Sequence, residues 1–452
     1  MVSDFFYPNM GGVEGHIYHL SQRLVRRGHK VVIVTHNYGD RVGVRYLSAG
    51  VKVYHVPHWL VTDQVSLPTI YCFFPLFRYI IVRERIDVVH GHAAFSSMCH
   101  EAILHARTMG LRACFTDHSL FGFEDTSSIL TNKLLKFTMS DIDHIICVSH
   151  TSKENTVLRA SLDPACVSVI PNAVVAADFK PDPSALTIVI TSRLVYRKGI
   201  DLLVSVIPRI CEKYGKVNFI IAGDGPKRIE LEQMRERNVL QERVQLLGAV
   251  IHSKIRDVLV RGHIFLNTSL TEAFCIAIVE AACCGLMVVS TRVGGVPEVL
   301  PSHMMIFAQP DEDDLMESIE SAIKIIETSP PDPYSLHEEV NRMYNWSDVA
   351  ERTERVYEVI MREPRLPLID RLRRFYGCGL YAGKLACMIV AVHHLLWVFL
   401  EWLVPRSGID VAPTFEHAKF LEMCKGVAAR ELVETGEEEE LDESFRDVRS
   451  ID

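Results

Sequence analysis

The most informative segment of the chain is Ser269-Leu-Thr-Glu-Ala-Phe-Cys-Ile-Ala-Ile-Val-Glu280. It follows a short apolar run, Ile264–Asn267, which predicts a buried strand. It continues into Ala281-Ala-Cys-Cys-Gly285, whose small residues and final glycine are typical of the end of a helix. The segment therefore predicts a strand, a short loop and a helix, as found in parallel α/β sheets.

This predicted helix places two carboxylates. Glu272 is expected just before the helix predicted at residues 274–284, and Glu280 about two turns further on at ~3.6 residues per turn. The backbone N–H groups near Ala273 and Phe274 would be free donors there, and phosphate binds readily to such groups. A carboxylate repels a phosphate, so a carboxylate beside a phosphate site is expected only if the ligand also carries hydroxyl groups for it to bind. A nucleotide sugar carries both phosphate and hydroxyl groups. An ordinary amphipathic helix with an acidic first turn is the alternative.

The length, composition and net charge of the sequence argue against several classes of protein. The chain has 452 residues, too many for one domain of about 100–200 residues, and 48% hydrophobic content is typical of a packed globular protein. The net charge of −9 argues against nucleic-acid binding. The 12 cysteines include no C-x-x-C pair, which predicts reduced thiols and no disulfide framework.

Apolar runs and helical segments alternate along most of the chain. The runs of the first part are Lys30–Thr35, Val51–Val56, Ile86–His90, Arg112–Thr116, Ile145–Val148 and Val167–Ile170. Those of the second part are Leu186–Thr191, Asn218–Ala222, Val244–Leu247, Ile264–Asn267 and Met287–Thr291. Such alternation predicts parallel sheets covered by helices on both faces. The fold class is thus predicted to be α/β, with two tandem doubly wound, Rossmann-like domains.

Domain boundaries follow from this alternation. Residues 1–171 are the predicted N-terminal domain and residues 172–345 the second, with a loose segment near its start, up to Pro183. Residues 346–362 are predicted to form an amphipathic helix. Ligands of doubly wound sheets bind beyond the carboxyl ends of the strands, so we expect the ligand between the two sheets.

The C-terminal part of the chain differs from both domains. Residues 378–404 are strongly apolar, without a charged residue at 385–400, and qualify as one transmembrane helix at the required ~20 residues. Five arginines precede this segment at positions 362–374, which by the positive-inside rule places the two domains in the cytoplasm. Residues 405–452 are predicted to form an acidic tail. A buried core helix or an interfacial hairpin is the alternative to a membrane span.

Two cations follow the first strand of the second domain. Arg193 and Lys198 lie in the loop Ser192–Gly199, where they would meet a pyrophosphate. A departing nucleoside diphosphate gains negative charge, and fixed cations lower the barrier to its departure. A solvated basic loop is the alternative. Gly294-Gly-Val-Pro-Glu298, after a later strand, offers a further loop with backbone donors.

The first domain contributes two more candidate positions. Gly11 and Gly12 open a helix predicted from Gly12 on and would let the backbone approach a phosphate, although a simple helix-start turn also explains them. His118 follows a predicted strand and can hydrogen-bond a ligand, with a structural histidine as the alternative. His90 and His92 carry the same ambiguity. No cluster of histidines and carboxylates has the spacing of a metal site, so no metal is predicted.

Several of these features together resemble the retaining, nucleotide-sugar-dependent glycosyltransferases of the group 1 type, which have the GT-B fold. The resemblance covers residues 1–362 and rests on Arg193, Lys198, the Glu272–Glu280 pair, Gly11-Gly12 and Gly294–Glu298. Longer blocks are similar to the catalytic subunits of the phosphatidylinositol N-acetylglucosaminyltransferases. These blocks are Ser3–Glu14, Phe115–Phe123, Ser149–Val157 and Ser192–Gly199.

This resemblance implies transfer of N-acetylglucosamine from UDP-GlcNAc to the inositol 6-hydroxyl of phosphatidylinositol, with retention of configuration. The reaction is the first step in the synthesis of glycosylphosphatidylinositol (GPI) anchors. It further implies a single-pass protein of the endoplasmic reticulum membrane with cytoplasmic catalytic domains, assembled with other subunits of a membrane transferase complex. Nucleic acid is not an expected partner.

The resemblance also assigns roles to residues. Arg193 and Lys198 would bind the UDP pyrophosphate, Glu280 the ribose hydroxyls and Glu272 the donor sugar, near the N–H groups of Ala273 and Phe274.

In the first domain, Gly12 beside Gly11 would approach the donor phosphate, and His118 would contact the GlcNAc near the reacting carbon. No cofactor and no metal would be needed, because cations and helix N-termini supply the positive field. The helix at 346–362 would cross back to the first domain.

Three other functions are weighed against this one. A soluble or peripheral retaining glycosyltransferase with another acceptor would not stay with membranes. A nucleotide-sugar-binding subunit without turnover would not need the full set of Arg193, Lys198, Glu272 and Glu280. A dinucleotide oxidoreductase is disfavoured, since the glycine-rich loops lack the G-x-G-x-x-G spacing.

Overall fold

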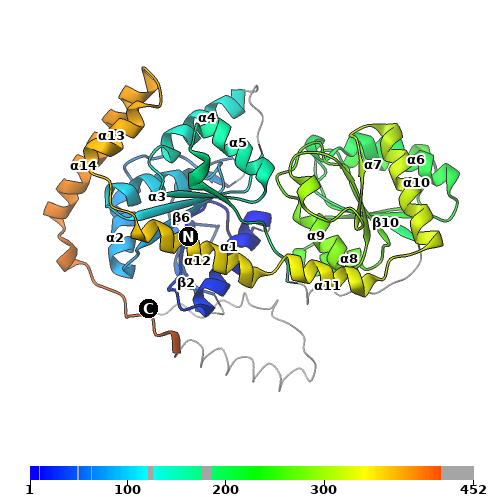
Figure 1. Cartoon of the computed structure of the whole chain (residues 1–452), viewed down its shortest axis with the longest axis horizontal. Helices are drawn as coiled ribbons and strands as arrows, with labels where there is room; N and C mark the ends of the chain where they lie inside the picture. Colours follow the sequence, from blue (N-terminus) through cyan, green and yellow to red (C-terminus); the bar gives the residue numbers. More distant parts are fainter. Residues whose placement is uncertain (10, 48–49, 63, 121–125, 176–185, 419–452) are drawn as a thin grey trace. The chain divides into compact units, whose positions relative to one another are not determined.

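The computed structural model describes residues 1–9, 11–47, 50–62, 64–120, 126–175 and 186–418 (Figure 1). The chain forms two compact units. Unit 1 comprises Met1–Val148, Ser152–Ile170 and the chain from Val349 on, and unit 2 comprises Ser149–Thr151 and Pro171–Asp348. Most of the predicted loose segment near Pro183, and the acidic run of the tail, lie outside the described residues.

Unit 1 is built on a mostly parallel sheet. One group of strands lies in the order β1 (Val32–His36), β3 (Lys52–Val56) and β2 (Gly43–Tyr46). A second group lies in the order β6 (Val88–His92), β7 (Arg112–Asp117), β8 (His144–Cys147) and β9 (Val167–Val169). Val2 makes parallel bridges to both Val34 and Gly91, so it joins the two groups of strands. The β2 strand is antiparallel and largely exposed, and it is absent from the predicted strands because it has no buried face.

Helices and one small hairpin complete this part of unit 1. The helices are α1 (Gly12–Arg26), α2 (Phe74–Glu84), α3 (Ser97–Thr108), α4 (Thr126–Met139) and α5 (His150–Ala160), and the hairpin is β4 (Leu60–Thr62) with β5 (Val65–Ser66). Apolar residues of α2 and α3 pack on the sheet, as their helical spacing predicts.

Unit 2 is a doubly wound sheet of six parallel strands. Their order is β12 (Val244–Gly248), β11 (Asn218–Ala222), β10 (Thr187–Thr191), β13 (Ile264–Asn267), β14 (Met287–Thr291) and β15 (Met305–Ala308). The helices are α6 (Ile200–Lys213), α7 (Arg228–Arg237), α8 (Ile255–Leu259), α9 (Ile276–Cys283), α10 (Glu312–Thr328) and α11 (Pro333–Met343). The order reverses between β10 and β13, where such sheets bind ligands. The predicted α/β fold class is confirmed.

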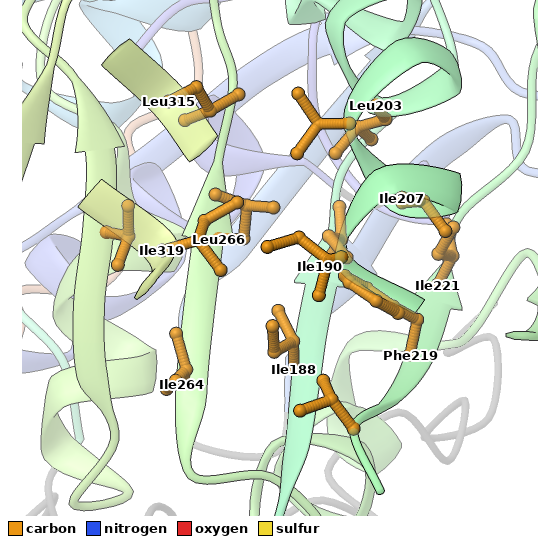
Figure 2. Packing of buried hydrophobic residues seen from close by; sticks show 14 of the residues in the cluster. Ile188, Ile190, Leu203, Ile207, Phe219, Ile221, Ile264, Leu266, Leu315 and Ile319 are labelled. Atoms are coloured by element: carbon orange, nitrogen blue, oxygen red, sulfur yellow. The ribbon is translucent and has the colours of Figure 1, made fainter. Parts of the chain in front are cut away.

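The core of unit 2 fixes this arrangement. Figure 2 shows Leu203 and Ile207 of α6, and Leu315 and Ile319 of α10, over the central strands. Each pair is four residues apart, so both side chains lie on one helix face. The strands contribute alternate residues such as Ile188 and Ile190, which point to the same face of the sheet.

Three helices follow unit 2 in sequence. They are α12 (Trp346–Arg362), α13 (Leu368–Tyr376) and α14 (Ala382–Leu403). From Val349 on, α12 belongs to unit 1, where Tyr357 Oη lies 2.5 Å from Nδ1 of His90. Glu354 of this helix forms an ion pair with Arg27, and its Oε1 lies 2.7 Å from Nε2 of His29. Among the described residues, α14 is the one helix long and apolar enough to cross a membrane. It falls within the predicted segment 378–404.

Candidate active site

The Lys198 loop of unit 2, residues 192–199, connects β10 to α6. Lys198 ends a short 3-10 turn, and Gly199 follows with a positive φ of 66°. A Cβ at Gly199 would overlap the carbonyl oxygen of Thr268, so the loop packs directly on the end of β13. The Thr268 hydroxyl donates to the carbonyl of Lys198 at 2.9 Å. Lys198 is thereby held at the carboxyl edge of the two central strands.

Glu272 meets Lys198 at this edge. The ammonium of Lys198 forms an ion pair with Glu272 Oε1, and both side chains remain partly exposed. The hydroxyl of Ser269 donates to the same oxygen at 3.0 Å, and the N–H of Gly295 donates to the Glu272 carbonyl at 2.9 Å. Glu272 is therefore oriented by groups from three separate loops.

The predicted start of the helix after Glu272 is wrong by two residues. The helix α9 begins at Ile276, because Cys275 before it has a left-handed backbone, with φ of 65°, that no helix continues. The N–H groups of Ala273 and Phe274 therefore lie in the preceding loop. The carbonyl of Ala273 is held there by the hydroxyl of Ser149 at 2.7 Å. The part of these two residues in donor binding stays a prediction.

Glu280 lies one turn into α9 and is buried. Its Oε1 lies 2.9 Å from Nε2 of His252, whose ring is half exposed. The sequence analysis did not single out His252. A polar residue shortly after the strand β12 was the available signal, since loops at this edge of the sheet supply binding residues.

Cys275, directly before α9, has a thiol whose pKa is affected by the charges of three predicted residues. Burial raises the pKa of its thiol to about 12, and the carboxylates of Glu272 and Glu280 act in the same direction while Lys198 opposes them. Arg193, in contrast, is exposed in the same loop as Lys198, and no partner of its guanidinium occurs among the described residues.

Unit 1 holds the remaining predicted residues. The helix α1 begins at Gly12, with Gly11 as its exposed N-cap, as the glycine pair predicts. His118 follows β7, and its Nε2 lies 3.4 Å from Nδ1 of His92 at the end of β6. The ring of His16, from α1, meets His118 edge to face with centroids 4.6 Å apart. The analysis missed His16, although its place one turn after the glycine pair was a usable signal.

His92 and His118 are neutral partners rather than cations. Burial lowers the pKa of His92 and His118 well below the usual value, and the neighbouring imidazoles add to the effect. The ring nitrogens of His16, His92 and His118 lie within 4.8 Å of one another, a spacing at which three imidazoles could bind a metal ion. The sequence predicted no metal, and that remains a prediction.

Two sequence families match the chain. The family described as PIGA (GPI anchor biosynthesis) matches residues 36–125, and Glycosyl transferases group 1 matches residues 185–324. The chain is 60% identical over 429 residues to the phosphatidylinositol N-acetylglucosaminyltransferase gpi3 subunit of Schizosaccharomyces pombe, covering 93% of this chain and 94% of that protein. It is 57% identical over 418 residues to a phosphatidylinositol N-acetylglucosaminyltransferase subunit of Homo sapiens, covering 91% and 86%.

Solved glycosyltransferase structures share the fold. A glycosyltransferase from Rickettsia africae matches 80% of this chain and 98% of its own length, with a TM-score of 0.64 at 17% identity. Anabaena Alr3699/HepE in complex with UDP matches 78% and 99%, with a TM-score of 0.62 at 16% identity. These likenesses confirm the predicted GT-B architecture.

Proposed function

Because the chain belongs to the family of the PIGA and GPI3 subunits of phosphatidylinositol N-acetylglucosaminyltransferase, we propose that its donor is UDP-GlcNAc and that the donor binds at the Lys198 loop. The chain is a glycosyltransferase subunit of GPI-anchor biosynthesis. The proposed reaction transfers N-acetylglucosamine to phosphatidylinositol, the two groups that the names of its relatives contain.

The ion pair between Lys198 and Glu272, at the carboxyl edge of the neighbouring strands β10 and β13, is the observation that supports this donor site. The ion pair satisfies both Lys198 and Glu272 while no donor is bound. A pyrophosphate carries more charge than one carboxylate, so it competes for the lysine ammonium. Glu272 is then free to accept hydrogen bonds from hydroxyl groups of the sugar.

Glu280 suits the ribose. Its carboxylate is buried one turn into α9 and faces the half-exposed ring of His252. A carboxylate accepts two hydroxyl donors side by side, as the ribose 2′- and 3′-hydroxyls present them. The nucleoside end of the donor would therefore lie toward α9 and the pyrophosphate toward the Lys198 loop.

Catalysis follows from where charge develops. The bond between the anomeric carbon and the phosphate oxygen breaks, and its electron pair leaves with UDP. Lys198 and Arg193 stabilise the charge on the departing diphosphate, and a fixed cation is worth about 10²-fold or more in rate. Since these cations supply the positive field, we propose that no metal ion or other cofactor takes part.

The remaining assignments concern unit 1 and the acceptor. Gly11 and Gly12 would approach the donor phosphate, and the neutral imidazole of His118 would hydrogen-bond the GlcNAc without adding charge. The inositol 6-hydroxyl would attack, with retention of configuration. Support for the acceptor position and for retention comes from the resemblance of the longer sequence blocks.

The protein is a membrane-associated component of a larger enzyme, as the names of its relatives imply. We place it at the endoplasmic reticulum with both units on the cytoplasmic side, together with other subunits of the transferase. The predicted single membrane span remains a prediction.

The reaction is tested in membranes from cells that lack the endogenous protein. Radiolabelled UDP-GlcNAc and phosphatidylinositol are incubated with membranes that contain or lack this chain, and the labelled lipid is isolated. A 6-deoxy inositol analogue and digestion with glycosidases specific for one anomer test the acceptor position and retention. Label in a lipid other than phosphatidylinositol would point to another acceptor.

A further inference from the structure

Three histidines of unit 1 come together at the carboxyl edge of its sheet. His92 is the last residue of β6, and His118 directly follows β7, the neighbouring parallel strand. Thr116 of β7 lies opposite His92, and His118 stands two residues further on, so their side chains lie on the same side of the sheet. Their rings are stacked with centroids 5.7 Å apart. His16 reaches both rings from α1, so the group joins three separate elements.

The separation of the ring nitrogens fits a tetrahedral metal ion. Nδ1 of His92 lies 3.4 Å from Nε2 of His118. Two nitrogens that bind one tetrahedral zinc ion at about 2.0–2.1 Å lie about 3.3–3.4 Å apart, so this pair already has the required separation. One nitrogen of His16 completes the group, and all three atoms lie within 4.8 Å of one another. An imidazole that rotates about its Cβ–Cγ bond moves its nitrogens by more than the remaining difference.

The histidines are held in the form that binds a metal ion. Imidazole coordinates through a nitrogen that carries no proton, and burial keeps the pKa of His92 and His118 well below the usual value. When Nδ1 of His92 faces the ion, the proton of this ring is on Nε2, which lies 3.3 Å from Sδ of Met1. The thioether sulfur is a weak acceptor for that N–H. A partner at the second ring nitrogen fixes the orientation of a metal-binding histidine.

A fourth histidine beside the group is not a ligand. The ring of His90 stacks on that of His92 with centroids 4.2 Å apart. Its Nδ1 lies 2.5 Å from Tyr357 Oη, and its Nε2 lies 2.7 Å from Thr116 Oγ1. Both nitrogens of His90 therefore have hydroxyl partners, and the site consists of three histidines. Because the ring of His118 is only half-buried, a fourth position on the ion remains for water.

The set of ligands selects the kind of ion. Magnesium and calcium prefer oxygen ligands, and this group, as far as the described part of the chain shows, includes no carboxylate. The same lack disfavours the sites of non-haem iron, which combine two histidines with one carboxylate. Copper(II) and nickel bind imidazole but prefer square-planar or tetragonal geometry. Three neutral imidazoles around one open position are typical of zinc.

We propose that His16, His92 and His118 bind one zinc ion, and that the bound ion blocks the transferase. The block rests on the proposed function, in which the ring of His118 hydrogen-bonds the GlcNAc. A nitrogen that coordinates zinc has no lone pair left for that hydrogen bond, and a divalent charge stands where a neutral sugar would bind. The ion takes no part in the transfer itself, so free zinc lowers the rate of the reaction.

Zinc binding is tested on the purified full chain, without reference to activity. Equilibrium dialysis is expected to find one zinc ion per chain that depends on the three histidines. His16→Gln should lower the affinity of this site about 100-fold or more, since losing a ligand costs more than losing a group that orients one. His19→Gln, at another histidine of α1, is the matched control and should bind zinc as the wild type does. Equal zinc binding by the wild type and by His16→Gln would overturn the proposal.

Cobalt identifies the atoms that hold the metal. Co²⁺ in a tetrahedral site absorbs visible light strongly, whereas octahedral Co²⁺ absorbs weakly, so the spectrum reports the geometry. We expect the tetrahedral spectrum for the wild type and for His19→Gln, and its loss in His16→Gln. A sulfur-to-cobalt charge-transfer band would show that cysteines bind the metal, and the proposal would fall. Zinc is also expected to raise the melting temperature of the wild type and not that of His16→Gln, whose melting curve without zinc shows whether it is folded.

Inhibition is measured in the assembled enzyme as incorporation of GlcNAc into phosphatidylinositol at buffered zinc concentrations. The wild-type rate is expected to fall over the range in which dialysis shows the site to fill. His16→Gln, compared with its own rate without zinc, should need about 100-fold more zinc, which also accounts for zinc bound to UDP.

The outcomes separate this proposal from the proposed function. Zinc that binds the three histidines without slowing the wild type would overturn the block and count against the role of His118 at the GlcNAc, while the metal site would be confirmed. Lack of transfer in every sample would concern the proposed function alone, because dialysis and the cobalt spectrum do not depend on it.

Discussion

Lys198 and Glu272, 74 positions apart in the sequence, form an ion pair at the carboxyl edge of the unit 2 sheet. The pair exists because the strands β10 and β13 are hydrogen-bonded neighbours. Each residue follows its strand through a short loop, so the topology of the sheet brings both to one point. The first two predictions concern this point.

Lys198→Ala is expected to lower turnover about 10²-fold or more, because the departing diphosphate loses a charge contact in the transition state. The initial rate of GlcNAc incorporation into phosphatidylinositol measures it in the assembled enzyme. Lys213→Ala removes a lysine that pairs with Glu320 on the surface, and it should change the rate little. Normal turnover of Lys198→Ala would refute the assigned role.

Glu280→Gln is expected to raise KM for UDP-GlcNAc about tenfold to a hundredfold, since the buried carboxylate loses charge-assisted hydrogen bonds to the ribose. His252→Ala removes the residue that contacts the same carboxylate and leaves the carboxylate in place. Its effect on KM should therefore be smaller. If Glu280→Gln had the KM of the wild type and only a reduced kcat, the proposed role of Glu280 in donor binding would be wrong.

Acid is expected to destabilise unit 1. Burial lowers the pKa of His90 and His92 well below 6.5, so the unfolded chain takes up protons there before the folded chain does. The free energy of unfolding therefore falls as the pH drops below about 6.5, by up to about 1.4 kcal/mol per pH unit for each histidine.

Urea denaturation at a series of pH values measures this dependence. His92→Gln should flatten the dependence, because a group that does not titrate replaces the buried imidazole. A wild-type stability that is constant between about pH 7 and pH 5 would show that these imidazoles are not held neutral.

Gly295→Ala is expected to destabilise unit 2 by about 1–3 kcal/mol and to reduce activity. A Cβ there would overlap the carbonyl oxygen of Ala273 and come within 2.6 Å of Ser149 Oγ, so the loop that orients Glu272 must move. Gly215→Ala is the matched control, because its Cβ would meet nothing within 4 Å. Equal melting temperatures of the two variants would count against this account.

Local patterns predicted much of the candidate site, and its gaps have physical causes. The glycine pair predicted the start of α1 at Gly12, and strand ends predicted the loops of Lys198 and His118. His252 and His16 were missed because each lies in a segment remote from the residue it contacts. The start of α9 was misplaced because Cys275 has a left-handed backbone, a conformation that its residue type does not favour and that no local pattern predicts.

The sequence alone determined the α/β class and the family. Because one face of each strand or helix is buried, apolar residues recur about every two residues in strands and about every four in helices. The residues of each motif likewise stand at a fixed spacing along the chain. The tertiary structure decided which distant side chains meet, such as Lys198 with Glu272, and it placed both flanks of α14 on unit 1. Contacts of this kind join segments that are remote along the chain, so no local pattern of residues predicts them.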